Sequence, residues 1–173
     1  MGHVFLAGLM GSGKTTLAQT VSQELGIPSY DLDERLSSRG SHGIPTTVDA
    51  ASWQDFRIRE AAELESFAFE PDGIVALGGG TLLSDRAFDL IERLGTSIFL
   101  DVPVEELVHR IGVDPTRPLL SQCSTLKEVE EILERLNRDR RKVYEMCNHT
   151  LQIISGEPLA STTMRLAEFV RRL

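Results

Sequence analysis

Short, largely apolar runs alternate with longer amphipathic segments along the chain. The apolar runs are of the kind expected for strands of a buried parallel sheet, and they occupy residues 3–7, about 27–33, 73–77, 96–100 and 150–154. Apolar residues at intervals of three and four predict helices over 15–25, 52–68, 84–94, 103–111, 125–147 and from about 159 to 173. This alternation predicts an α/β fold of three layers, in which helices cover both faces of a five-stranded parallel sheet.

The ends of the predicted helices carry the residues that such ends prefer. Ser52 and Ser84 precede helices as N-caps, and Thr125-Leu126-Lys127-Glu128 forms a capping box at the start of the longest helix. Gly26 and Gly95 follow two of the helices, where glycine commonly ends a helix. These signals set the boundaries of the predicted elements.

Two segments show neither pattern. Residues 38–45 contain glycines and serines and predict a loop. Residues 112–123 include Asp114-Pro115-Thr116-Arg117-Pro118, which is too polar and too rich in proline for a helix. A loop of that length in a compact fold is typical of a lid or a binding loop. Because no linker separates the elements, we expect residues 1–173 to form a single domain.

The composition, 41% hydrophobic and 25% charged, is that of a soluble globular protein. No apolar run approaches the ~20 residues of a membrane helix, and the N-terminus does not resemble a signal peptide. We therefore expect a cytoplasmic protein without a membrane partner. The 26 acidic and 18 basic side chains leave a net charge of −8, which argues against a nucleic-acid partner. Cys123 and Cys147 lack metal-ligand spacing, so we expect two reduced thiols.

The strongest chemical signal is the stretch Gly8-Leu9-Met10-Gly11-Ser12-Gly13-Lys14-Thr15, which fits the phosphate-binding pattern G-x-x-x-x-G-K-S/T. A glycine-rich turn between a strand and a helix lets backbone N–H groups approach a phosphate closely. Lys14 supplies a positive charge for the outer phosphates, and the Thr15 hydroxyl group can complete a magnesium shell. The nucleotide-binding residues predicted here are Gly11, Ser12, Gly13, Lys14, Thr15 and Thr16.

Acidic residues follow two of the predicted strands. Asp31 and Asp33 lie two residues apart at a strand end, where both side chains can point the same way. Asp33 could instead be the N-cap of a short helix over 34–38. Asp101 also follows an apolar strand, and it is a second candidate for a carboxylate that supports magnesium.

Two arginines lie on helix faces that are otherwise apolar. Arg57 and Glu60 share the apolar face of their helix, so the partner of Arg57 is either Glu60 or the anionic group of a ligand. Arg140 occupies an apolar position of the longest helix, whereas Arg138 and Arg141 are expected on its solvated faces.

Gly78, Gly79 and Gly80 end the strand over 73–77. Three consecutive glycines lose conformational entropy without a return in packing. Because a tight turn needs only one glycine, we expect another group to approach this backbone closely.

Six motifs occur in order along the chain: the P-loop near the N-terminus, Asp31-x-Asp33, Phe56-Arg57-x-x-Glu60, Gly78-Gly79-Gly80, Arg117-Pro118-Leu119-Leu120 and Arg140-x-x-x-Tyr144. Together they resemble the shikimate kinases, small P-loop kinases related in fold to the nucleoside monophosphate kinases. The resemblance covers nearly the whole chain. It implies a P-loop NTPase-type fold with a lid over about 112–123 and a substrate-binding subdomain over about 32–61. Ser52-Trp53 departs from the Gly-Glu pair that the family often has.

The resemblance implies transfer of the γ-phosphoryl group of ATP to the 3-hydroxyl group of shikimate, a step in the biosynthesis of chorismate and the aromatic amino acids. Asp33 would hold the ring hydroxyl groups and help to orient or deprotonate the nucleophile. Arg57 and Arg140 would bind the shikimate carboxylate, which suits a guanidinium fork. The backbone of Gly78-Gly79-Gly80, and of Gly79 above all, would meet the substrate.

For the phosphates, the resemblance implies that Lys14 and the loop amides hold the β and γ groups. Thr15 would ligate Mg²⁺, and Asp31 would support it. Arg117, from the lid, would neutralise charge on the transferred group. The implied catalytic residues are therefore Lys14, Asp33 and Arg117.

For adenine, the resemblance suggests Arg110 on one side and the loop with Glu157 and Pro158 on the other. Arg110 could equally be a solvated helix end. The implied partners are ATP and shikimate, and we expect a monomer.

Other functions fit parts of the pattern. Two arginines and a carboxylate would also suit a kinase for another small hydroxy acid such as gluconate, whereas a nucleoside monophosphate would usually require more basic groups around its phosphate. A regulatory nucleotide-binding protein without phosphoryl transfer is a further alternative. Against it, Lys14, Thr15, Asp31, Asp33 and Arg117 are all present.

Overall fold

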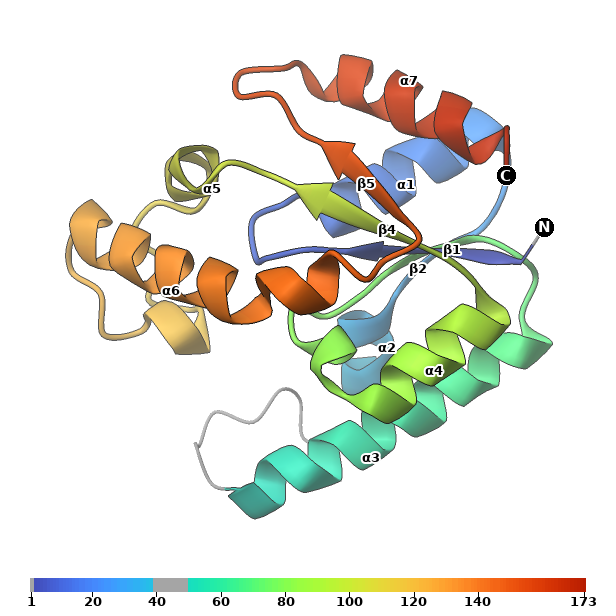
Figure 1. Cartoon of the computed structure of the whole chain (residues 1–173), viewed down its shortest axis with the longest axis horizontal. Helices are drawn as coiled ribbons and strands as arrows, with labels where there is room; N and C mark the ends of the chain where they lie inside the picture. Colours follow the sequence, from blue (N-terminus) through green and yellow to red (C-terminus); the bar gives the residue numbers. More distant parts are fainter. Residues whose placement is uncertain (1, 39–49) are drawn as a thin grey trace.

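A five-stranded parallel sheet forms the centre of the computed structural model, which describes residues 2–38 and 50–173 (Figure 1). The strands are β1 (His3–Ala7), β2 (Ser29–Asp31), β3 (Ile74–Ala76), β4 (Gly95–Asp101) and β5 (His149–Gln152), and they lie in the order β2-β3-β1-β4-β5. Every neighbouring pair is parallel. The predicted five-stranded parallel sheet is confirmed.

Helices cover both faces of the sheet. They are α1 (Lys14–Leu25), α2 (Leu32–Ser38), α3 (Ala50–Ser66), α4 (Asp85–Leu94), α5 (Val104–Ile111), α6 (Leu126–Tyr144) and α7 (Leu159–Val170), with short 3-10 turns η1 (Phe67–Phe69), η2 (Thr81–Leu83) and η3 (Pro118–Leu120). Helices α1 and α7 pack together on one side of the sheet, and α3 and α4 pack together on the other (Figure 1). The predicted three-layer arrangement follows from these two groups.

The central strands are apolar because both of their faces are covered. Val4, Phe5 and Leu6 of β1 are at most 1% exposed, and Val75 of β3 and Ile98 of β4 are buried to the same degree. Burial on both faces explains why these strands are continuous apolar runs instead of alternating patterns. Within residues 2–38 and 50–173, no helix combines the length and the apolar character needed to cross a lipid bilayer.

The predicted helix ends are correct at Gly26, Ser84, Gly95 and Thr125 and wrong at Ser52. Ser84 caps α4, and Thr125 and Glu128 make both hydrogen bonds of the capping box at the start of α6. Ser52 is not an N-cap, because α3 is already helical at Ala50. Apolar periodicity alone could not place this boundary, because a serine is compatible with the interior of a helix as well as with its cap.

Helix α2 begins directly after β2. Asp31 Oδ1 accepts a hydrogen bond from the backbone N–H group of Glu34 at 3.1 Å, so Asp31 caps the helix and Asp33 lies in its first turn. The alternative that made Asp33 the N-cap is therefore wrong, and so is the expectation that Asp33 lies with Asp31 at the end of the strand, because β2 ends at Asp31 and Asp33 is helical. Of the predicted loop over 38–45, only Ser38 belongs to the described residues.

The predicted lid segment, residues 112–123, is anchored at its C-terminal end. It contains the 3-10 turn η3, in which Leu120 is fully buried, and Cys123 is also buried. Cys147 is buried as well, and both cysteines are free thiols, as predicted.

The strand order brings several predicted site residues to one edge of the sheet. Leu6 of β1 pairs with Ala76 of β3, and Ala76 also pairs with Asp31 of β2. The P-loop after β1, the glycines after β3 and Asp31 at the end of β2 therefore meet at the carboxyl edge. In open parallel sheets this is the edge at which ligands bind.

Candidate active site

The P-loop runs from the end of β1 to the start of α1. Gly13, the N-cap of α1, has a φ angle of 92°, and Gly11 has a φ angle of 77°. Both angles lie in the left-handed region that favours glycine. A methyl group on Gly11 would also lie 2.7 Å from the side chain of Ile111. The loop can therefore take this shape only with small residues at these positions.

Lys14 points back over the P-loop. Its Nζ atom donates hydrogen bonds to the carbonyl oxygens of Gly8 and Leu9, each at 2.9 Å. Burial lowers the pKa of Lys14 to about 8, against the opposing effect of the negative charges of Asp33 and Asp31. The ammonium group is therefore still mainly charged at pH 7, as phosphate binding requires.

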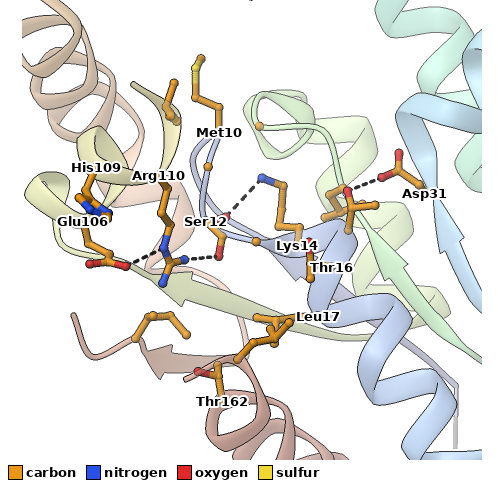
Figure 2. A pocket seen from close by; sticks show the side chains of 18 of the residues that line it. Met10, Ser12, Lys14, Thr16, Leu17, Asp31, Glu106, His109, Arg110 and Thr162 are labelled. Atoms are coloured by element: carbon orange, nitrogen blue, oxygen red, sulfur yellow. Dashed lines mark hydrogen bonds and ion pairs between the residues drawn. The ribbon is translucent and has the colours of Figure 1, made fainter. Parts of the chain in front are cut away.

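The P-loop forms part of the wall of a pocket of about 700 Å³, called here the larger pocket (Figure 2). It is lined by the predicted residues Gly11, Ser12, Gly13, Lys14, Thr15, Thr16, Asp31, Asp33, Arg110, Arg117 and Glu157. Pro158 does not line it, although the next residue, Leu159, does. The structure thus gathers nearly all of the predicted nucleotide-binding residues around one cavity.

Arg110 forms part of the wall of the larger pocket and is not a freely solvated helix end. Its Nε atom donates to Glu106 at 2.8 Å, and its Nη1 atom donates to the backbone oxygen of Ser12 at 3.5 Å (Figure 2). The hydrogen bond from Arg110 lowers the pKa of Glu106. These contacts hold the guanidinium plane beside the P-loop.

Thr15 and Asp31 form an oxygen-rich corner of the larger pocket. The Thr15 hydroxyl group donates to Asp31 Oδ2 at 2.6 Å, while Asp31 Oδ1 is held by the cap of α2. Hydroxyl and carboxylate oxygens are ligands that Mg²⁺ prefers, so these two residues fit a magnesium site.

The second candidate for the magnesium carboxylate, Asp101, has another partner. Arg141 Nη1 and Nη2 donate to its two carboxylate oxygens at 2.6 and 2.8 Å. Asp101 lines neither of the two pockets described here among residues 2–38 and 50–173. Geometry therefore favours Asp31. The expectation that Arg141 belongs to a solvated face holds only in part, because its side chain is partly exposed but paired with Asp101, whereas Arg138 is exposed as predicted.

A second pocket of about 220 Å³, called here the smaller pocket, adjoins the first. It is lined by the predicted residues Asp33, Arg57, Gly78, Gly79, Gly80, Arg117 and Arg140, together with Met10, Trp53, Phe56, Glu60, Pro118 and Leu119. Its three arginines come from different parts of the chain: Arg57 from α3, Arg140 from α6 and Arg117 from the segment between α5 and α6. A small cavity with three arginines and an apolar wall suits a small organic anion.

Arg57 has an internal partner and also lines the smaller pocket. Its Nη1 atom is hydrogen-bonded to Glu60, whose other carboxylate oxygen accepts a hydrogen bond from the Thr81 hydroxyl group at 2.6 Å. The rings of Trp53 and Phe56 lie 5.6 and 5.5 Å from the guanidinium carbon. The internal partner that the sequence suggested for Arg57, Glu60, is therefore confirmed, and Arg57 also faces the smaller pocket, where an anionic ligand as a second partner stays a prediction.

The glycines after β3 are needed because side chains of the site approach their backbone closely. The φ angles of Gly78, Gly79 and Gly80 are not positive, so other amino acids could adopt the same backbone conformation. A methyl group on Gly78 would lie 2.8 Å from Asp33 Oδ1, and one on Gly80 would lie 2.7 Å from Arg57 Nη2. The expected close approach is confirmed for these two glycines, and the approaching groups are side chains of the site.

Asp33 lies where the two pockets meet, since it lines both. Burial raises its pKa to about 6, and the negative charges of Asp31 and Glu60 act in the same direction, whereas Lys14 and Arg57 oppose them. In the described part of the chain its carboxylate accepts no hydrogen bond. The carboxylate is therefore poorly solvated and mainly ionised at pH 7, which suits a group that accepts a proton or a hydrogen bond from a ligand.

The raised pKa of Asp33 predicts a pH-dependent loss of stability. A pKa that is higher in the folded state than the ordinary value of 3.8 favours folding at low pH, and this contribution disappears as the pH rises through about 6. Asp33→Asn should therefore stabilise the protein more at pH 7.5 than at pH 4, by on the order of 2 kcal/mol. Urea unfolding at both pH values measures this difference. Asp89→Asn, on an exposed face of α4, is the control, and equal effects of the two variants would contradict the prediction.

Several lining residues were not predicted from the sequence. Met10 lines both pockets but occupies a variable position of the P-loop pattern, so the motif carried no signal for it. Glu106 and His109 share one face of α5 with Arg110, and this spacing could have indicated them. Trp53 gave a signal only as a departure from the family pattern.

Comparison with known proteins identifies similar sequences. The family model described as shikimate kinase matches residues 10–171. A shikimate kinase of Neisseria meningitidis serogroup C is 36% identical over 131 residues, which cover 76% of this chain and 77% of that protein. A shikimate kinase of Salinibacter ruber is 33% identical over 173 residues, covering 97% of this chain and 84% of that protein.

Solved structures show the same similarity in three dimensions. A shikimate kinase from Acinetobacter baumannii, solved in complex with shikimate, superimposes with a TM-score of 0.81 at 26% sequence identity. The match covers 99% of this chain and 92% of that protein.

Proposed function

The chain belongs to the shikimate kinase family, and we propose that its two adjoining pockets hold ATP and shikimate for direct phosphoryl transfer. The protein is an ATP-dependent kinase that transfers the γ-phosphoryl group of ATP to the 3-hydroxyl group of shikimate, giving shikimate 3-phosphate and ADP. In this proposal the larger pocket binds ATP and the smaller pocket binds shikimate.

One observation carries this assignment: Asp33, Arg117, Met10 and Gly79 line both pockets. A carboxylate and a guanidinium group thus stand at the junction between a phosphate-binding loop and a pocket with two further arginines. Phosphoryl transfer needs the nucleophile and the transferred group in line at such a junction, with little covalent chemistry from the protein.

On the ATP side, Lys14 and the N–H groups of the P-loop bind the β and γ phosphates. Thr15 and Asp31 hold Mg²⁺, which neutralises charge on the phosphate oxygens when it is bound. Arg117 completes the positive surroundings of the transferred group. Its Nε atom is paired with Asp114 at 3.0 Å, and among residues 2–38 and 50–173 its two terminal nitrogens have no hydrogen-bond partner, so that they can bind phosphate oxygens.

On the shikimate side, Asp33 accepts the hydrogen bond of the attacking hydroxyl group and takes up its proton as the bond to phosphorus forms. Arg57 and Arg140 bind the carboxylate of shikimate, and the backbone of Gly78, Gly79 and Gly80 contacts its ring. Because the pocket is small and partly aromatic, it suits a compact ring better than an extended acid.

The adenine base lies between Arg110 and the segment with Glu157 and Pro158. Arg110 is already oriented by Glu106 and the P-loop, so its planar face is available for stacking. Glu157 is held by Arg165 at 2.7 Å and by the Thr162 hydroxyl group at 3.0 Å. These contacts keep the segment before α7 in place.

We also propose that the chain is one domain in which residues 112–123 close over ATP as a lid and about 32–61, of which 39–49 lie outside the described residues, form the shikimate subdomain. We further propose that the protein acts as a monomer. ATP is a cytoplasmic metabolite, which supports a cytoplasmic location. The net charge of −8 does not favour binding to nucleic acid or to an anionic membrane.

ADP release with Mg²⁺ and ATP tests this function, with shikimate, gluconate and AMP offered in parallel. We expect turnover with shikimate alone, and none in the Lys14→Ala variant. Turnover with gluconate or AMP instead would reassign the smaller pocket. Binding of ATP without turnover on any acceptor would favour a regulatory protein.

Substitution of the glycines after β3 should distinguish the role of Asp33 in catalysis from the role of Arg57 in shikimate binding. Gly78→Ala displaces the Asp33 carboxylate and should lower kcat by about tenfold, because small displacements of a reacting group slow catalysis strongly. Gly80→Ala displaces Arg57 and should mainly raise the KM for shikimate. Steady-state kinetics of both variants decide between these effects. The same kinetic change in both would show that the methyl groups only perturb the loop.

A further inference from the structure

Tyr144 belongs to a motif of the chain but has no part in the reaction described above. It stands one helical turn after Arg140 on α6, so both side chains lie on the same face of the helix. Both donate to one atom: Arg140 Nη1 to the carbonyl oxygen of Gly79 at 2.8 Å, and the Tyr144 hydroxyl group to the same oxygen at 2.5 Å. A carbonyl oxygen has two lone pairs and accepts both bonds at once.

Tyr144 is itself fixed by the core. It is 2% exposed, and its ring stacks on that of Phe99 in β4, with 5.0 Å between the ring centroids. The Arg141 guanidinium lies 5.3 Å from the Phe99 ring and is held by both carboxylate oxygens of Asp101. The end of β4 therefore determines where the phenol oxygen stands.

Arg140 has less support of its own. Within residues 2–38 and 50–173 it forms no ion pair, and its contacts are with the Gly79 carbonyl oxygen and the Tyr144 hydroxyl group. The carbonyl oxygens of Gly78 and Gly80 accept backbone hydrogen bonds within the loop, from Thr81 and Leu83, whereas that of Gly79 is bonded by the two side chains of α6. A long side chain such as that of Arg140 loses much entropy when it is held in one place.

We propose that Tyr144 is a positioning residue of the acceptor site. Its hydroxyl group fixes the carbonyl group of Gly79, and through that carbonyl group it places the guanidinium of Arg140 where an acceptor carboxylate binds. The inference rests on the proposed function for the identity of the acceptor. The Asp101–Arg141 ion pair, the Phe99 ring and Tyr144 then form one support that links β4 to the acceptor pocket.

Tyr144→Phe removes only the hydroxyl group and tests the proposal. We expect the KM for shikimate to rise about 5- to 20-fold, which is the usual effect of losing such a hydrogen bond. The KM for ATP should change less than about twofold and kcat less than about threefold, because Arg140 does not touch the reacting atoms.

The chain contains two tyrosines, and the other provides a matched control. The hydroxyl group of Tyr30 donates to the backbone oxygen of Pro71 at 3.0 Å and lines neither pocket. Tyr30→Phe should leave the KM for shikimate unchanged. If Tyr144→Phe lowers the melting temperature but leaves the KM for shikimate as in Tyr30→Phe, Tyr144 is structural and the proposal is overturned.

A double-mutant cycle shows whether Tyr144 acts through Arg140. The effect of Tyr144→Phe on the KM for shikimate should disappear in an Arg140→Ala background, because no guanidinium remains to be placed. Equal effects in both backgrounds would overturn the proposal. A failure of the proposed function is recognised separately, since the parent would then not phosphorylate shikimate.

A measurement without an acceptor keeps the inference testable in that case. The ¹⁵N relaxation of the Arg140 Nε–H group reports the order of its guanidinium in the ATP-free protein. We expect this order to fall clearly in Tyr144→Phe and to stay unchanged in Tyr30→Phe. Unchanged order in Tyr144→Phe would overturn the proposal whatever the acceptor.

Discussion

Asp33→Asn is expected to lower the kcat of shikimate phosphorylation by about 10²- to 10⁴-fold, the range found for removal of a general base. The amide has nearly the shape of the carboxylate but cannot take up the proton of the 3-hydroxyl group. Because the pKa of Asp33 is raised to about 6, the parent should also lose kcat/KM for shikimate as the pH falls through that value. The variant should lack this step in its residual activity.

Single-turnover and steady-state kinetics between pH 5 and 8 measure both effects. Asp89→Asn makes the same chemical change at an exposed site of α4 and should behave like the parent. Shikimate affinity, measured by calorimetry, should change far less than kcat in Asp33→Asn. A kcat within about threefold of the parent would mean that phosphoryl transfer here proceeds without a protein base and that Asp33 only binds the ring.

Arg140→Ala is expected to weaken shikimate binding by about 30- to 200-fold and to leave ATP binding largely intact. The expected loss corresponds to ~2–3 kcal/mol, which is typical of a charge-assisted hydrogen bond to a carboxylate. Arg140 lines the smaller pocket and not the larger one, so its loss should be felt by one substrate only. Calorimetric titration of shikimate and of ATP into the same protein measures the two affinities.

Arg138→Ala provides the matched control on the same helix. The Arg138 side chain is 69% exposed and lies 3.8 Å from Glu134, so its removal should change neither affinity. Equal loss of both affinities in Arg140→Ala would show that Arg140 is a structural arginine. The smaller pocket would then bind its anion through Arg57 and Arg117.

The active site lowers the stability of the folded protein at neutral pH, and the environment of Asp33 explains why. Asp33 is held near two other carboxylates, Asp31 and Glu60, and partly away from water, which raises its pKa. Asp33→Asn should therefore give a protein that is more stable at neutral pH and much less active. Such an opposition of stability and activity is common where an active site holds a poorly solvated charge.

Local patterns in the sequence were sufficient for the fold and for most of the site. Apolar runs identified the central strands because β1, β3 and most of β4 are buried on both faces, whereas the edge strands β2 and β5 are only partly buried. The P-loop pattern identified the phosphate site because its residues are contiguous. Parallel strands place their carboxyl ends at one edge, so Asp31, Lys14 and Gly78 could be expected together before their distances were known.

Tertiary structure alone decided which polar groups are partners. Asp31 and Asp101 have the same sequence context, but strand order places Asp31 beside Thr15 and gives Asp101 to Arg141, 40 residues away. The sequence alone also did not reveal where α3 begins, that Arg57 contacts both Glu60 and the smaller pocket, or that Tyr144 supports Gly79. Hydrophobic periodicity reports how a segment faces the core, because burial acts on each residue separately. The choice of partner for a charge depends on which distant segments the fold brings within hydrogen-bond distance, and no local pattern encodes that choice.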